Sequence, residues 1–246
     1  AESYNTDLHG NFVTCECEIT SGKSLLVTAN HYVEIHNRLI NYGTVTVEND
    51  GNLIQRNDAS VNVGSIKVKR NANLKRLDYN YWGSSVAGQN LKAFSPGTLS
   101  TRFYTYNEAD DFFYVISPTA NDFIPGKGYA IRAPNDYTIT NAVFNGEFFG
   151  VPNNGVISVN VAKTINGYNL VANPYASNIN FANFFSANSS VINNIAYFWT
   201  NVNPNPAMQG SNYPSGGFLN NYAIYNGSGG VPATGPAQNG SVTPNQ

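Results

Sequence analysis

The chain has 246 residues, of which 41% are hydrophobic and 13% aromatic, enough to bury one large core or two modest ones. Only 11% of the residues are charged, and the net charge of -2 offers no basic surface to nucleic acid. No apolar run approaches the ~20 residues of a membrane helix, so we expect no membrane insertion. The chain opens at Ala1 with neither an initiator Met nor a signal peptide, which suggests a piece of a longer protein.

Two cysteines, Cys15 and Cys17, lie close together in the stretch TCECEIT. A strand would point both side chains to one face, where a bridge between them would be strained. The three histidines, His9, His31 and His36, follow no ligand spacing that would support a zinc site. Two interpretations remain open: two buried thiols on one strand face, or a local disulfide formed in an oxidising compartment.

Very short strands follow one another from about residue 12 to residue 70. Apolar residues alternate with polar ones at period two, and the gaps between the strands are filled by Asn, Gly and Asp. This rhythm predicts successive turns of a parallel β-solenoid, with a small antiparallel sandwich turning through Gly43 and Gly51 as the alternative. The residues expected to point inward are Val33, Ile35, Val45, Val47 and one of Leu53 and Ile54.

The stretch KVKRNANLKRLD closes the predicted solenoid and gathers much of the basic charge of the chain. We expect Ile66 and Val68, with Leu74 and Leu77 beyond, to face inward, so that the basic side chains form a solvated outer face. The alternative is a site that attracts an acidic polymer. The basic residues are Lys67, Lys69, Arg70, Lys75 and Arg76. The expected organisation is a solenoid over residues 1–75 and a second domain over residues 76–246.

Longer strands separated by Gly/Pro loops follow, and about eight of them suggest an antiparallel β-sandwich or jelly-roll-like domain. Residues 179–188 are the one candidate for a helical turn or two. The Gly/Pro-rich tail after Asn226 is expected to be a long loop or the start of an incomplete strand. The predicted strands are RFYTYN, DFFYVIS, GYAIRAP, AVFNGEFFG, GVISVNVA, GYNLVAN, IAYFWTN and NYAIYN.

Several ordered motifs carry a resemblance over nearly the whole chain: TCECEITSGKSLLVTANHYVEIHNRLINYG, LDYNYWGSSVAGQNLKAFSPGT, FIPGKGYAIRAP, FNGEFFGVPNNG, GYNLVANPYAS and IAYFWT. Together they resemble a module near the C-terminal end of very large secreted surface proteins of the Bacteroidetes, often ahead of a sorting domain of the type IX secretion system. The resemblance implies an extracellular, cell-surface location and secretion machinery as a partner. Ala172 and Ser85 depart from the family pattern, where Gly and Pro are common.

No spacing in the sequence indicates catalysis. The densest acidic cluster, Glu108, Asp110 and Asp111, lacks the D-x-D-x-D-G spacing of a calcium loop and is expected to be an exposed turn. No nucleophile elbow, HExxH pair or complete nucleotide-binding glycine pattern is present. We therefore expect no enzyme, no metal and no cofactor; a hydrolase using Glu108 or Asp111 is a third hypothesis.

Aromatic residues are the other candidate functional groups. Tyr79, Tyr81 and Trp82 could form a platform on which sugar rings stack, while neighbouring Asn and Asp side chains bind the hydroxyl groups. Alternation along a strand would turn some of these rings inward, so the opposing expectation places Trp82 and Trp199 largely buried in the sandwich.

The sequence thus favours a non-enzymatic segment of a secreted cell-surface protein, acting as a structural stalk or adhesion module within a larger parent chain. The alternative is a carbohydrate-binding accessory module of an exported polysaccharide-degrading enzyme. Possible contacts are glycans or solid surfaces. A stalk requires the open end of the solenoid to be capped, and we expect the second domain to cap it through a rigid junction. The residues expected at this junction are Leu74, Leu77, Tyr79 and Tyr81.

Overall fold

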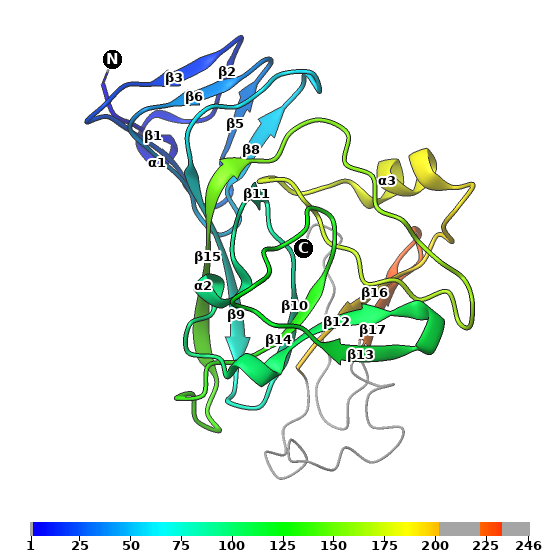
Figure 1. Ribbon diagram of the computed structural model, residues 1–246. Coiled ribbons are helices and arrows are strands. Elements are labelled where there is room, and N and C mark those ends of the chain that lie inside the picture. The colour runs from blue at the N-terminus through cyan, green and yellow to red at the C-terminus, as the bar shows by residue number, and fades with distance from the viewer. Residues whose placement is uncertain (1, 202–221, 233–246) are drawn as a thin grey trace.

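The N-terminal part of the computed structural model is a β-solenoid-like arrangement of parallel strands on three faces (Figure 1). The structure describes residues 2–201 and 222–232. The first face is formed by β1 (Tyr4–Asn5), β4 (Ser24–Val27), β7 (Thr44–Val47) and β9 (Ile66–Leu74). The second is formed by β2 (Phe12–Thr14), β5 (Tyr32–Ile35) and β8 (Asn52–Gln55), and the third by β3 (Cys17–Ile19) and β6 (Leu39–Asn41).

Equivalent residues of successive coils stack in the solenoid interior. Leu25 pairs with Val45 and Val33 pairs with Leu53, so one coil takes about twenty residues. Because side chains alternate across a strand, every second residue enters the interior, and Val33 and Val45 are no more than 1% exposed. The predicted parallel strands and inward residues are confirmed, with Leu53 rather than Ile54 in the core, and the antiparallel alternative through Gly43 and Gly51 is wrong.

The two thiols differ in their surroundings. Cys17, on β3, is buried, and burial raises its pKa, whereas Cys15 lies outside the strand and is exposed. Both are free. The expectation of two buried thiols on one face is therefore wrong, and so is the alternative of a local disulfide. The chain reaches a corner between the two residues, which turns Cys15 away from the interior.

The solenoid does not end at a linker, because β9 is shared with the second part of the chain. Its first residues pair with β7 in parallel, through Thr46 with Lys67 and Val47 with Val68. Along its other edge β9 pairs antiparallel with β15 (Ala142–Pro152), from Ile66 opposite Gly150 to Leu74 opposite Ala142. β11 (Val86–Ala87) joins the end of β15 and completes one continuous sheet (Figure 1).

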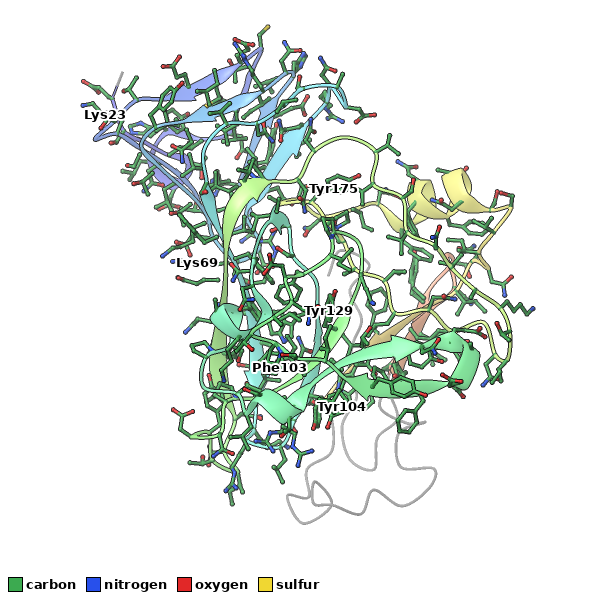
Figure 2. All side chains as sticks on the ribbon, viewed as in Figure 1. Lys23, Lys69, Phe103, Tyr104, Tyr129 and Tyr175 are labelled. Carbon is green, nitrogen blue, oxygen red and sulfur yellow. The ribbon has the colours of Figure 1, made fainter. Side chains whose placement is uncertain are left out.

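Loops of the second part cover the remaining end of the solenoid. The Leu53 amide donates a hydrogen bond of 2.8 Å to the Ala176 carbonyl oxygen, and the Asn62 side chain donates one of 3.0 Å to the Pro152 carbonyl oxygen. Asn154 donates from its side chain to carbonyl groups of the turn after β8, and Tyr175, labelled in Figure 2, bonds the Gly155 carbonyl oxygen. Loops of the second part thus provide hydrogen-bond partners for the last solenoid coil, in the place where a further coil would provide them.

The position of this junction corrects the sequence-based prediction. Leu74 is buried, but it lies at the far end of β9. Tyr79 and Tyr81 lie in a separate sheet, where they contact other aromatic rings. The true contacts could not be read from the sequence because they depend on β15 and on loops that are distant in sequence from the solenoid strands, such as Asn62 with Pro152, 90 residues apart.

A four-stranded antiparallel sheet forms the centre of the second part. Its order is β10 (Tyr79–Trp82), β14 (Tyr129–Arg132), β12 (Phe103–Asn107) and β13 (Phe112–Val115). One face packs on β15, where the Trp82 ring lies 5.5 Å from Phe144. The fully buried rings of Phe103 and Tyr129, labelled in Figure 2, belong to the same core. Trp82 is buried as expected.

The opposite face of this central sheet contacts a second antiparallel sheet, β16 (Ala196–Trp199), β17 (Tyr222–Tyr225) and β18 (Gly230–Val231). Trp199 is only half-buried there, so the expectation for that residue was too strong. The described helical elements are α1 (Thr6–His9), α2 (Leu91–Phe94), α3 (Phe181–Asn188) and the 3₁₀ turns η1 (Ser100–Arg102) and η2 (Glu108–Asp110). α3 confirms the predicted helical turns.

Two predicted strands do not form as such: residues 155–162 form no strand, and in residues 167–173 only Val171 forms an isolated antiparallel bridge, with Lys127. The Asn169 side chain accepts from the Ala162 amide and donates to the Ala162 carbonyl oxygen, so it satisfies the backbone groups of Ala162 in place of a neighbouring strand. The expected loop beyond residue 232 lies outside the described residues.

The basic stretch is mixed in character. Lys67 and Lys69 are partly exposed and form ion pairs with Glu147 and Glu48, as a solvated face predicts. Lys75 is buried, and the Arg70 guanidinium is sequestered against carbonyl oxygens. The prediction of a solvated basic face is therefore wrong for Lys75.

Candidate functional site

The predicted aromatic platform is divided between the two faces of β10. Tyr79 and Tyr81 point to the face that meets β16 and β17, whereas Trp82 points to the core beside Phe94 and Phe148. The structure therefore does not bring the three residues to one surface. Trp82 is only 7% exposed and cannot offer a ring face to a ligand without unfolding of the core.

Tyr81 lies at the centre of an aromatic cluster. Its ring stacks on Phe113 at 6.0 Å and tilts against Trp199 at 5.7 Å, and its hydroxyl group lies 2.6 Å from that of Tyr222. Burial raises the pKa of Tyr81, so the hydroxyl group stays protonated. The Trp199 indole donates to the Tyr79 carbonyl oxygen at 2.8 Å. These contacts join two sheets and leave Tyr81 little freedom to bind a sugar.

The acidic cluster is also structural. Glu108 is buried rather than exposed, and its carboxylate accepts backbone N–H groups from Thr164, Ile165 and Gly167 at 2.7 to 2.9 Å. These bonds, led by that from Thr164, hold the pKa of Glu108 at about 2. A general acid needs a raised pKa, so this geometry opposes the hydrolase hypothesis for Glu108. The expected exposed turn is wrong for this residue.

A more open site lies beside β15, where alternation gives the strand two different faces. Phe144 and Phe148 point into the core, while Asn145, Glu147 and Phe149 point outward. Phe149 is 62% exposed, which is unusual for so large a ring. The outward residues thus combine a carboxylate, an amide and an exposed aromatic ring on one strand.

The second wall of this site is the segment from Gly88 to Pro96. β9 covers one edge of β15 along its length, whereas β11 covers only the last residues of the other edge. Along the rest of that edge lies α2, as Figure 1 shows. A groove of about 530 Å³ separates the two elements, and Asn90, Ala93 and Pro96 line the side opposite Phe149.

Internal hydrogen bonds fix the walls of the groove. The buried Gln89 side chain accepts from the Phe149 amide at 2.7 Å, which ties the wall to the strand. Asn90 accepts from the amides of Lys92 and Ala93 and donates to Asn121, so its amide group is already occupied. Within residues 2–201 and 222–232, the Asn145 side-chain amide has no hydrogen-bond partner, so it can bond to a ligand.

The charges at the groove are balanced. Glu147 pairs with Lys67 at 3.0 Å, and both side chains remain about two-fifths exposed. This pair offers both an acceptor and a donor to hydroxyl groups, beside an aromatic surface that can cover a sugar C–H face. Phe149 is not among the site residues predicted from the sequence, although the period-two pattern of FNGEFFG places Phe148 and Phe149 on opposite faces of the strand.

Residues 2–201 and 222–232 contain neither a metal-binding cluster nor a membrane-spanning helix. In that part of the chain, no group of three His, Cys, Asp or Glu side chains is arranged to hold a metal ion. Likewise, none of the described helices has the length and apolar character needed to span a membrane.

The comparisons with known proteins identify a family. A family model described as "Domain of unknown function (DUF8693)" matches residues 4–246, so the chain belongs to this family. Neither the curated proteins nor the solved structures give a match. The matched region thus covers both the solenoid-like part and the second part. The family description gives no function, so the function is inferred from the geometry.

Proposed function

We propose that the chain is a non-enzymatic, load-bearing segment of a secreted cell-surface protein, acting as a stalk or adhesion module. Strand β9 supports this proposal best, because it pairs with β7 on one edge and with β15 on the other. Force applied to the solenoid would pass through backbone hydrogen bonds into the second part, without a linker that could bend. A module of this kind transmits both position and load.

The finer features of the proposal rest on the sequence resemblance and on packing. The contact between β16–β17 and the central sheet supports a β-sandwich over residues 76–246. The resemblance to Bacteroidetes surface proteins supports an extracellular location and export by the type IX secretion machinery. The further partners proposed are the remainder of the parent chain and glycans or surfaces outside the cell.

Nicking the chain at the domain boundary tests the load-bearing role. A protease site is inserted in the turn between Lys75 and Asp78, the chain is cut, and the product is analysed by size-exclusion chromatography without denaturant. We expect the two fragments to elute together, because the β9–β15 ladder and the Leu53–Ala176 bond lie outside the nick. The same site at exposed Ser189 and Ser190 confirms that the protease is active. Two separately eluting, folded halves would refute the rigid stalk.

Carbohydrate binding is a second candidate function, and the groove beside β15 favours it. Exposed Phe149 supplies a stacking surface, while Asn145 and Glu147 line the groove with hydrogen-bonding groups. Lys67 is held close to them by its ion pair with Glu147. Whether Tyr79 and Tyr81 take part in sugar binding stays a prediction. The module would then be an accessory to an exported polysaccharide-degrading enzyme.

Affinity electrophoresis against a panel of neutral polysaccharides tests this second function. Phe149→Ala and Asn145→Ala should abolish retardation in a gel that retards the wild-type chain. Phe112→Ala is the matched control, since this ring is 58% exposed on β13, away from the groove. If no polysaccharide retards the wild-type chain, or if Phe112→Ala has the same effect as Phe149→Ala, the groove is not a sugar site.

A further inference from the structure

Two arginines lie side by side on the central sheet, next to Tyr79 of β10. Arg132 ends β14 and pairs directly with Tyr79 of β10. Arg102 immediately precedes Phe103, which pairs with Ile131, so the strand register sets Arg102 beside Arg132. The Arg102 guanidinium donates to the Tyr104 hydroxyl group at 3.2 Å, and the Tyr104 ring lies 5.8 Å from that of Tyr79.

Neither guanidinium has an acidic partner. The ion pairs of residues 2–201 and 222–232 involve neither Arg102 nor Arg132, and the segments outside this description contain no Asp or Glu. The Nε atoms of both arginines are buried without a hydrogen-bond partner in the described structure. Arg132 is only 7% exposed, and within the described residues its guanidinium donates one hydrogen bond, of 3.0 Å, to the side-chain oxygen Oδ1 of Asn135.

Without a bound anion, this pair of guanidinium groups is energetically unfavourable. A buried cation without a counter-charge is strongly disfavoured, and a second cation beside it adds repulsion. Burial lowers the pKa of Arg132, and the nearby charges of Arg102 and Arg76 lower it further. Guanidinium groups nevertheless remain charged at neutral pH, so the site holds an uncompensated positive charge.

We propose that Arg102 and Arg132, with the hydroxyl groups of Tyr79 and Tyr104, bind an oxyanion, either a carboxylate or a sulfate group. Two guanidinium groups present planar forks of N–H donors that match such an anion, and the tyrosine hydroxyl groups add neutral donors. The anion would supply the missing counter-charge. The proposal is independent of the stalk role and of the groove at Phe149.

Nuclear magnetic resonance of the arginine Nε–H groups provides a direct test on the wild-type chain. Sodium sulfate and sodium acetate are each titrated against sodium chloride at equal ionic strength. We expect saturable shifts of the Arg102 and Arg132 Nε–H resonances with at least one anion, and none with chloride. If neither anion produces a saturable shift at these two groups, the proposal is overturned.

Variants add a second readout. Arg102→Gln, at a half-buried position, should weaken the anion affinity by at least about tenfold, as expected for loss of one charged hydrogen-bonding group. Arg38→Gln is the matched control, because Arg38 is an exposed solenoid residue paired with Glu16. Unchanged affinity in Arg102→Gln, or an equal loss in Arg38→Gln, would contradict the assignment.

The source of the anion is distinguished by a further titration. A uronic-acid oligosaccharide and a sulfated oligosaccharide are compared with a neutral one of the same length. Tighter binding of an acidic oligosaccharide than of the corresponding free anion would identify an acidic glycan as the ligand. Binding of the free anions alone would identify a small-anion site, and both results satisfy the proposal.

Discussion

Leu53 and Ala176 are joined by a backbone hydrogen bond of 2.8 Å at the place where a further solenoid coil would otherwise pair with β8. The loop that carries Ala176 therefore substitutes for a coil on the second face of the solenoid, while β15 extends the first face. The exposed edge of the last coil is covered by two segments that are distant from it in sequence.

Among the polar residues at the junction between the solenoid and the second part, substitution of Asn62 should lower the stability most. Its side chain accepts from the Leu39 amide and donates to the Pro152 carbonyl oxygen, and Asn62 is 8% exposed. Asn62→Ala leaves both groups unpaired, so the free energy of unfolding should fall by about 1–3 kcal/mol in a urea titration. Asn73→Ala, on the exposed side of β9, should change it by less than about 0.5 kcal/mol. Equal effects of the two substitutions would contradict the role of Asn62.

A side chain at Gly43 should disturb the stacking of the coils. A Cβ atom there would lie 2.6 Å from the Thr20 carbonyl oxygen of the preceding coil. Because backbone atoms cannot easily yield, Gly43→Ala should destabilise the fold by about 1–3 kcal/mol in thermal or urea denaturation. Gly229→Ala is the control, since its Cβ atom would meet nothing within 4 Å. A neutral Gly43→Ala would show that the coils can separate at this corner.

Truncation to Ala should lower the free energy of unfolding strongly at Trp82 and hardly at all at Phe149. Trp82 contacts Phe94 at 5.1 Å and is buried, so Trp82→Ala should cost about 3–5 kcal/mol of unfolding free energy. Phe149→Ala removes an exposed ring and should stay within about 0.5 kcal/mol. Chemical denaturation of both variants checks the distinction. A large loss for Phe149→Ala would make that ring a packing residue and weaken the sugar-binding interpretation.

The loop held by Glu108 should loosen in acid. A carboxyl group whose pKa is lowered on folding stabilises the protein fully above its ordinary value of 4.5 and loses that contribution as the pH falls towards about 2. The protection factors of the amides at residues 164–167, taken relative to the intrinsic exchange rate at each pH, should therefore fall over this interval. Glu108→Gln should expose these amides already at neutral pH and flatten the pH dependence, whereas exposed Glu18→Gln should not. Identical pH profiles for wild type and Glu108→Gln would exclude this role.

The two thiols should be chemically distinct. Exposed Cys15 should react with a maleimide in the native protein, while Cys17 should react only after denaturation because it is buried and its pKa is raised. Mass spectrometry should thus find one label before denaturation and two after it. Cys15→Ser should abolish the native label. Two labels on the native protein would show that β3 opens readily.

The solenoid was predictable because its signal is local. Val33 and Ile35 lie two residues apart on one short strand, and Val45 and Val47 repeat the pattern in the next coil, so periodicity alone identifies the buried face. The spacing between coils then follows from the intervening turns. No distant residue is needed to infer this part of the fold.

The junction and the groove could not be predicted in the same way. The pattern of FNGEFFG shows that Phe148 and Phe149 point to opposite faces, but which face is covered depends on the core beneath β15, including Trp82 and Phe94. Arg102 and Arg132 are likewise brought together only by the register of β12 and β14. Pairings of this kind carry no periodic signal, since the partner strands are separated by loops of unrelated composition.

The mixed pairing of β9 makes the closure of the solenoid independent of its length. Every coil presents the same kind of parallel edge to its successor, and only the last one must meet β15 and the loop at Ala176. Whole coils could therefore be gained or lost ahead of β7 in the course of evolution, without altering a single contact of the cap. The length of the solenoid could then differ between relatives, while the cap formed by β15 and the loop at Ala176 stays the same.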